Sequence, residues 1–162
     1  MITRRMKFRA GLTVVALTVL GTHTAFAQAG AGEQGPSLYD RLGGLAPIAV
    51  VVSDFLDALV PDAVLNANPA IDAARKRVPT PYLKYHLTAM VCQVTGGPCQ
   101  YHGRGMKESH AHLHITEHEW DRMVTVFKEI LAKHQVPTKE TEELLAIVGT
   151  TKADIVVSAG GR

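Results

Sequence analysis

The spacing of apolar residues is helical along almost the whole chain after residue 36. A first long helix is expected to begin near Pro47, and its inward face would carry Ile48, Val51, Val52, Phe55, Leu56 and Leu59. No segment alternates between apolar and polar positions as a half-buried strand does. The pattern therefore predicts an all-α domain.

Prolines and glycines divide the next part of the chain. The prolines at 69, 79 and 81 forbid a long helix between residues 61 and 81 and leave room for a short one over 70–77. Thr80 is expected to cap a further helix that ends before the Gly96-Gly97-Pro98 turn. His86 lies on the inward stripe of that helix, with Leu83, Leu87, Met90, Val91 and Val94.

One short and two long helices are predicted in the C-terminal part. Residues 106–113 allow two turns and carry His110. Thr116 begins a capping box for a long helix that Pro137 ends. A last helix, capped by Thr138, is expected to run to about residue 157. The short helix has little apolar surface of its own, so something other than its own packing should hold it.

The first 27 residues have the organisation of a secretory signal peptide. Arg4, Arg5, Lys7 and Arg9 precede an apolar run over 10–21, and Ala25-Phe26-Ala27 forms a small-x-small cleavage site. That run is about a dozen residues, shorter than the roughly 20 that span a bilayer. The Arg4-Arg5 pair also makes twin-arginine export an alternative, although the residues after it match that signal poorly.

These features predict a domain organisation and a location. We expect cleavage near Ala27 and export to a bacterial periplasm, with no membrane association after processing. A flexible leader over 28–36, a single folded domain over 37–157 and a flexible tail over 158–162 would follow.

Removal of the signal changes the meaning of the net charge. The 162-residue chain has a formal charge of +2, but residues 1–27 hold four of its 17 basic side chains and none of its 15 acidic ones. The exported chain would have 13 basic against 15 acidic side chains, a net charge of −2. It keeps no cluster of basic and aromatic residues, which argues against a nucleic-acid partner.

Histidine is the chemically suggestive residue, because four of the eight lie between His110 and His118. One interpretation is a Zn or Cu site formed by His110, His114 and His118. The helix break expected at Thr116 keeps these three off one helical face. In a second interpretation, His110 faces His86 across a flat apolar slot, which suits an iron porphyrin. A third interpretation is that each histidine is only a core or boundary residue with its hydrogen bonds satisfied. Sequence spacing alone does not decide among the three interpretations.

Several motifs together resemble the group 1 truncated haemoglobins. They are Ser37-Leu-Tyr-Asp-Arg-Leu-Gly-Gly44, Val51-Val-Ser-Asp-Phe55, Gly96-Gly-Pro, Tyr101-His-Gly-Arg-Gly-Met-Lys-Glu-Ser-His110 and Ile115-Thr. The resemblance covers about residues 37–157. It implies a truncated globin fold, a two-over-two helical sandwich around non-covalently bound haem b, and a function in binding oxygen or nitric oxide at the iron.

The resemblance also implies site residues, position by position. His110 takes the place of the proximal iron ligand, and His86 that of a distal histidine that binds iron directly in some members. The other implied haem contacts are Leu83, Leu87, Tyr101, Met106, Ile115 and Trp120. The second nitrogen of a ligating histidine needs an orienting acceptor, and a backbone carbonyl of the same helix would supply it.

One departure from the family bears on function. Leu56 and Leu87 stand where many members place Tyr and Gln, which donate hydrogen bonds to bound oxygen. Tight oxygen storage is therefore not expected unless His86 or Tyr85 supplies a donor. An enzymatic role in nitric oxide or peroxide detoxification would need an electron-transfer partner or a distal acid–base group, and the two leucines give it little help.

Two structural questions stay open at this stage. The stretch between residues 59 and 80 is longer than usual in the family and lacks the Phe that commonly wedges against haem, which Leu65 or Ile71 would replace. Cys92 and Cys99 either form a disulfide, as an exported protein allows, or are one buried and one surface thiol. The chain has no Cys-x-x-Cys-His motif, so covalent c-type haem is not expected.

Overall fold

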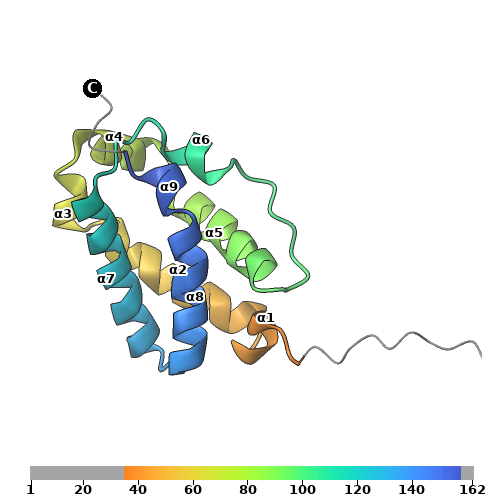
Figure 1. Cartoon of the computed structure of the whole chain (residues 1–162). Helices are drawn as coiled ribbons and strands as arrows, with labels where there is room; N and C mark the ends of the chain where they lie inside the picture. The colour runs from red at the N-terminus through yellow and green to blue at the C-terminus, as the bar shows by residue number, and fades with distance from the viewer. Residues whose placement is uncertain (1–34, 158–162) are drawn as a thin grey trace, which may run out of the picture. The chain divides into compact units, whose positions relative to one another are not determined.

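The computed structural model in Figure 1 describes residues 35–157, so the predicted signal peptide, most of the leader and the tail lie outside the described residues. Helices account for nearly all regular structure in this part. They are α1 (Leu38–Arg41), α2 (Leu45–Leu59), α3 (Ala63–Asn66), α4 (Pro69–Arg77), α5 (Thr80–Val94), α6 (Met106–His110), α7 (Glu117–Lys133), α8 (Thr138–Thr150) and α9 (Lys152–Ile155). The described residues contain no strand, and the all-α prediction is confirmed. In this part of the chain, no helix combines the length and apolarity that crossing a membrane requires.

The core lies where α2 crosses two other long helices. α2 packs against both α5 and α7, and α7 packs against α8, so two helical pairs face each other (Figure 1). The buried cluster between them consists of Ile48, Val52, Phe55, Leu56, Val126 and Ile130. Within it, the Phe55 and Phe127 rings meet edge to face, with centroids 5.2 Å apart. The apolar stripe predicted for the first long helix therefore faces inward.

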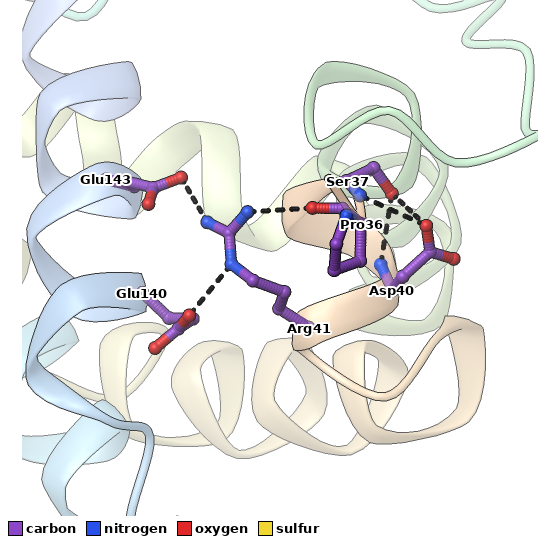
Figure 2. Close-up of polar contacts among 6 residues, drawn as sticks. All are labelled: Pro36, Ser37, Asp40, Arg41, Glu140 and Glu143. Atoms are coloured by element: carbon purple, nitrogen blue, oxygen red, sulfur yellow. Dashed lines mark hydrogen bonds and ion pairs between the residues drawn. The ribbon is translucent and has the colours of Figure 1, made fainter. Parts of the chain in front are cut away.

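Two helices of a single turn escaped the sequence prediction, and side-chain caps hold both. Ser37 and Asp40 form a capping box around α1, while the Asp62 carboxylate accepts hydrogen bonds from two backbone amides at the start of α3. Arg41 then fastens α1 to α8 (Figure 2). Its Nε donates to Glu140 at 2.8 Å, another guanidinium nitrogen pairs with Glu143, and a third bond reaches the Pro36 carbonyl.

The predicted caps of two helices are wrong. Thr80 and Thr138 are the first helical residues of α5 and α8, and Pro79 and Pro137 occupy the N-cap positions without a side-chain hydrogen bond. The proline ring holds φ near the value that starts a helix. A hydroxyl cap is therefore replaced by a fixed backbone angle at both places.

Two C-terminal helices are shorter than predicted. α6 ends at His110, because the Leu113 amide turns back to the His110 carbonyl and His114 adopts a left-handed φ of 52°. The helix expected to reach about residue 157 breaks between α8 and α9. There, the Thr150 and Thr151 hydroxyls donate to backbone carbonyls of the preceding turn at 2.6 and 2.7 Å.

Candidate functional site

His110 is half-buried on α6, and its ring has one nitrogen engaged and one available. Nδ1 lies 2.8 Å from the Met106 carbonyl oxygen. A carbonyl only accepts, so Nδ1 carries the proton and Nε2 keeps its lone pair. Among the described residues, Nε2 has no hydrogen-bond partner. The orienting carbonyl expected from the sequence is therefore present, and the remaining nitrogen has the electronic state of a metal ligand.

The surroundings of His110 favour its neutral form. Burial lowers the pKa of the imidazole, and the nearby His112 acts in the same direction. The hydrogen bond to Met106 opposes both without outweighing them, so the pKa lies below its ordinary value of 6.5. At neutral pH, the ring is therefore unprotonated, as iron ligation requires.

The segment that carries His110 is held from outside its own helix, as its sparse apolar surface predicts. α6 packs against α9 (Figure 1), and the Val157 amide donates to the Ile115 carbonyl at 2.8 Å. From the other side, Asn68 Nδ2 donates to the Leu113 carbonyl at 2.9 Å. Sequence reasoning missed Asn68, although its place directly before Pro69 marks it as a helix cap.

His86 is half-buried on α5 among aromatic rings. Its ring centroid lies 4.2 Å from that of Tyr82, 5.1 Å from that of Tyr85 and 6.0 Å from that of Tyr101. No hydrogen bond joins His86 to another described residue. The predicted site residues His86 and Tyr101 are thus brought together, whereas Tyr82 was not predicted. Its position four residues before His86 on one helix face could have indicated it.

The other predicted haem contacts lie on several helices. Leu83 and Leu87 are half-buried and pack against the cluster that contains Leu56, so apolar side chains meet between α2 and α5. Tyr101, Met106 and Ile115 are half-buried, and Trp120 on α7 is buried. Of the two candidates for the missing Phe, Leu65 is buried and Ile71 is half-buried.

The histidines of the alternative Zn or Cu site are dispersed. His112, His114 and His118 are exposed, and His110 turns one nitrogen to its own helix. Within residues 35–157, no three His, Cys, Asp or Glu side chains converge as metal ligands. The His110–His118 stretch is therefore not an assembled site of that kind.

Cys92 and Cys99 form a disulfide, with Cα atoms 5.7 Å apart. Cys92 is fully buried on α5, and Cys99 belongs to the connection between α5 and α6. Val94, predicted on the inward stripe of α5, is 49% exposed, so that part of the predicted stripe is wrong.

A cavity of about 470 Å³ lies elsewhere in the domain, between α1, α2, α7 and α8, with Val91 of α5 also in its lining. Its lining includes Pro47, Val51, Phe127 and Leu131, and none of the predicted haem contacts. It is therefore distinct from the region around His86 and His110.

Comparison with known proteins assigns the family. A family model described as bacterial-like globin matches residues 37–157. The chain belongs to this globin family. It is 31% identical to the group 1 truncated hemoglobin GlbN of Nostoc sp. (strain MUN 8820), over 74% of this chain and 97% of that protein. GlbN of Nostoc commune is 30% identical over the same shares.

Solved structures of 2/2 globins share the fold. The truncated hemoglobin from Tetrahymena pyriformis in its Fe(III) form has a TM-score of 0.65 at 19% identity, covering 76% of this chain and all of that one. The 2/2 hemoglobin from Synechococcus sp. PCC 7002, in the cyanomet state and with covalently attached heme, has a TM-score of 0.64 at 22% identity, covering 75% and 98%. The predicted truncated globin fold, a two-over-two helical sandwich, is confirmed.

Proposed function

We propose that this globin binds haem b non-covalently through His110 and takes up a diatomic gas, oxygen or nitric oxide, at the iron. The observation that carries the proposal is the state of the His110 ring. Its Nδ1 proton is directed to the Met106 carbonyl, and Nε2 has no partner in the described part of the chain. Since burial also favours the neutral ring, the donor suits ferrous or ferric iron.

Bound haem would supply an iron centre with a coordination position for a small ligand. The chain's own residues would orient the proximal imidazole through Met106 and hold α6 in place through Asn68 and α9. On the distal side, Leu56 and Leu87 offer no hydrogen bond to a polarised ligand. Ligand retention would therefore depend on His86 or on an apolar surrounding alone.

His86 is the candidate for reversible sixth ligation of the iron. It is half-buried, and aromatic contacts rather than hydrogen bonds surround its ring. An imidazole without a hydrogen-bond partner in the described residues is available for a metal. Release of His86 from the iron would then open a position for gas.

Both the non-covalent attachment and the export are supported by the cysteines. The chain's two cysteines are joined to each other, so neither is available for a thioether bond to haem.

Disulfides form and persist in oxidising compartments such as the bacterial periplasm. We include export with cleavage near Ala27 in the proposal. N-terminal sequencing of the secreted protein should find Gln28 as the first residue. An uncleaved N-terminus would contradict the proposed export.

Absorption spectra of haem-loaded variants test the proposed ligands. His110→Ala should lose specific ligation and the corresponding Soret band, and His110→Gly should recover it when imidazole is added. The matched control is His112→Ala, because His112 is exposed and close by. His86→Ala should convert a low-spin ferric spectrum to a high-spin one. A Soret band that His110→Ala leaves unchanged would overturn the proximal assignment.

A further inference from the structure

The connection between α5 and α6 is fastened to α5 at two neighbouring positions. Cys99 is bonded to Cys92, and the Tyr101 amide donates to Gln93 Oε1 at 2.5 Å. Both partners, Cys92 and Gln93, belong to the last turns of α5, the helix that carries His86. The disulfide and the hydrogen bond therefore fix the path of the chain after α5 and the position of the Tyr101 backbone.

The side chain of Tyr101 is held in one orientation. Its hydroxyl donates to the Arg104 carbonyl at 2.9 Å, and its ring lies over Gly103. A Cβ at Gly103 would come within 2.2 Å of the Tyr101 hydroxyl oxygen, so this close approach requires glycine. The ring then meets His86 edge to face, with an angle of 89° between the planes.

Tyr101 is the aromatic neighbour of His86 that comes from outside α5. Tyr82 and Tyr85 lie on the same helix as His86 and keep their register whenever α5 is formed. The contact with Tyr101 depends instead on the fold of the connection, which the Cys92–Cys99 bridge and the Tyr101–Gln93 hydrogen bond hold together. In the described residues no hydrogen bond holds the His86 ring, so these aromatic contacts determine its orientation.

We propose that the Cys92–Cys99 disulfide, acting through Tyr101, holds the His86 ring in the orientation in which it ligates haem iron. The inference rests on the proposed haem binding and adds Tyr101 as a positioning residue. With the bridge closed, His86 loses less conformational freedom on ligation. With the bridge open, the connection loosens, the Tyr101 contact is lost and the open iron position gains population. The thiol–disulfide state would then set the availability of the gas site.

Opening the bridge requires a defined reductant. A dithiol attacks one sulfur, the S–S bond breaks, and the dithiol is oxidised to a disulfide as it delivers two electrons and two protons. Cys92 and Cys99 are left as thiols. Because Cys92 is fully buried and Cys99 is half-buried, the Cys99 sulfur is the accessible point of attack.

The ferric spectrum of the haem-loaded full chain tests the inference. Tyr101→Ala and the pair Cys92→Ala/Cys99→Ala should each lower the ratio of His86-ligated to open iron about threefold to tenfold, the range expected for one aromatic contact. Tyr101→Phe keeps the ring but loses the hydroxyl bond to Arg104, so its ratio should lie between those of the wild type and Tyr101→Ala. Dithiol treatment of folded wild-type protein should reproduce the effect of the cysteine pair without any substitution, and should have no effect on that pair.

Thr116→Ala is the control that separates a general loss of stability from a specific effect on His86. Thr116 caps α7 and does not contact His86, so this variant should be less stable but keep the wild-type ratio. If Tyr101→Ala and bridge opening leave the ratio unchanged while haem remains bound, the inference fails and the proposed haem binding stands. A wild-type protein that binds haem without any His86-dependent low-spin signal also overturns the inference. Absence of a Soret band in every variant and in the wild type instead overturns the proposed function.

Discussion

The nitrogen atoms of His110 illustrate how much chemistry one residue can determine. The resemblance of its Tyr-x-Gly-Arg-x-Met-x-x-x-His run to the truncated haemoglobins singled it out, and the chemistry of a ligating histidine predicted a backbone carbonyl acceptor for one nitrogen. The structure supplies that acceptor at Met106. The contact of His86 with Tyr101 was beyond prediction, because it depends on the path of the 95–105 connection. The contact with Tyr82 could have been inferred, because Tyr82 lies four residues before His86 on the same helix.

Asn68 is the residue whose role is most easily dissected by substitution. Its Oδ1 caps α4 by accepting from Ala70 and Ile71, while its Nδ2 donates to the Leu113 carbonyl near His110. Asn68→Ala should lower the free energy of unfolding by about 2 kcal/mol, because both functions are lost. Asn68→Asp keeps the cap acceptor and loses only the donor, so it should cost about 1 kcal/mol. Urea denaturation measures both, and equal losses would contradict this division.

At the scale of elements, the sequence located the long helices and the short helices α4 and α6, and missed the four-residue helices α1 and α3. α2, α5, α7 and α8 were predicted from their apolar spacing. α1 and α3 have four residues each, too few for a period, and only their capping residues Ser37 and Asp62 indicate them. The break after α8 was missed because apolar spacing does not report hydroxyls that turn back to their own helix.

The turn after α5 should tolerate no side chain at Gly97. An added Cβ would lie 2.4 Å from the Tyr39 ring and 2.8 Å from the Cys92 carbonyl oxygen. Gly97→Ala should therefore lower the free energy of unfolding by about 1–3 kcal/mol. Gly149→Ala is the matched control, since nothing lies within 4 Å of its Cβ in α8, and it should raise stability by about 0.5–1 kcal/mol. Thermal melts showing the same sign for both would refute the packing argument.

At the scale of the whole domain, carboxylates join helices that are distant in sequence. Asp54 on α2 pairs with Lys133 and His134 at the end of α7, Asp62 caps α3 and pairs with Arg122 on α7, and Glu140 on α8 pairs with Arg41. Hydrogen bonds from Lys133 and His134 lower the pKa of Asp54, and those from Arg41 lower that of Glu140. Burial opposes ionisation of Asp62, yet Arg122 and two backbone amides outweigh it and lower its pKa as well.

These lowered pKa values predict the direction of acid sensitivity. A carboxyl whose pKa is lower in the folded state contributes stability above its unfolded pKa, which is 3.8 for Asp and 4.5 for Glu. That contribution is lost as the pH falls through the folded values. The free energy of unfolding should therefore decrease below about pH 4.5, and the decrease should be smaller in Asp62→Asn. A stability that stays constant from pH 5 to pH 3 would contradict the prediction.

The two-over-two arrangement places His86 on α5 and His110 on α6, and the account of function depends on both meeting one haem. The most direct test is the absorption spectrum of the haem-loaded ferrous protein before any gas is admitted. We predict a Soret band that requires His110, with the six-coordinate low-spin pattern that His86→Ala converts to a five-coordinate one. A spectrum that matches free haem in the same buffer, unchanged in His110→Ala, would contradict the central claim.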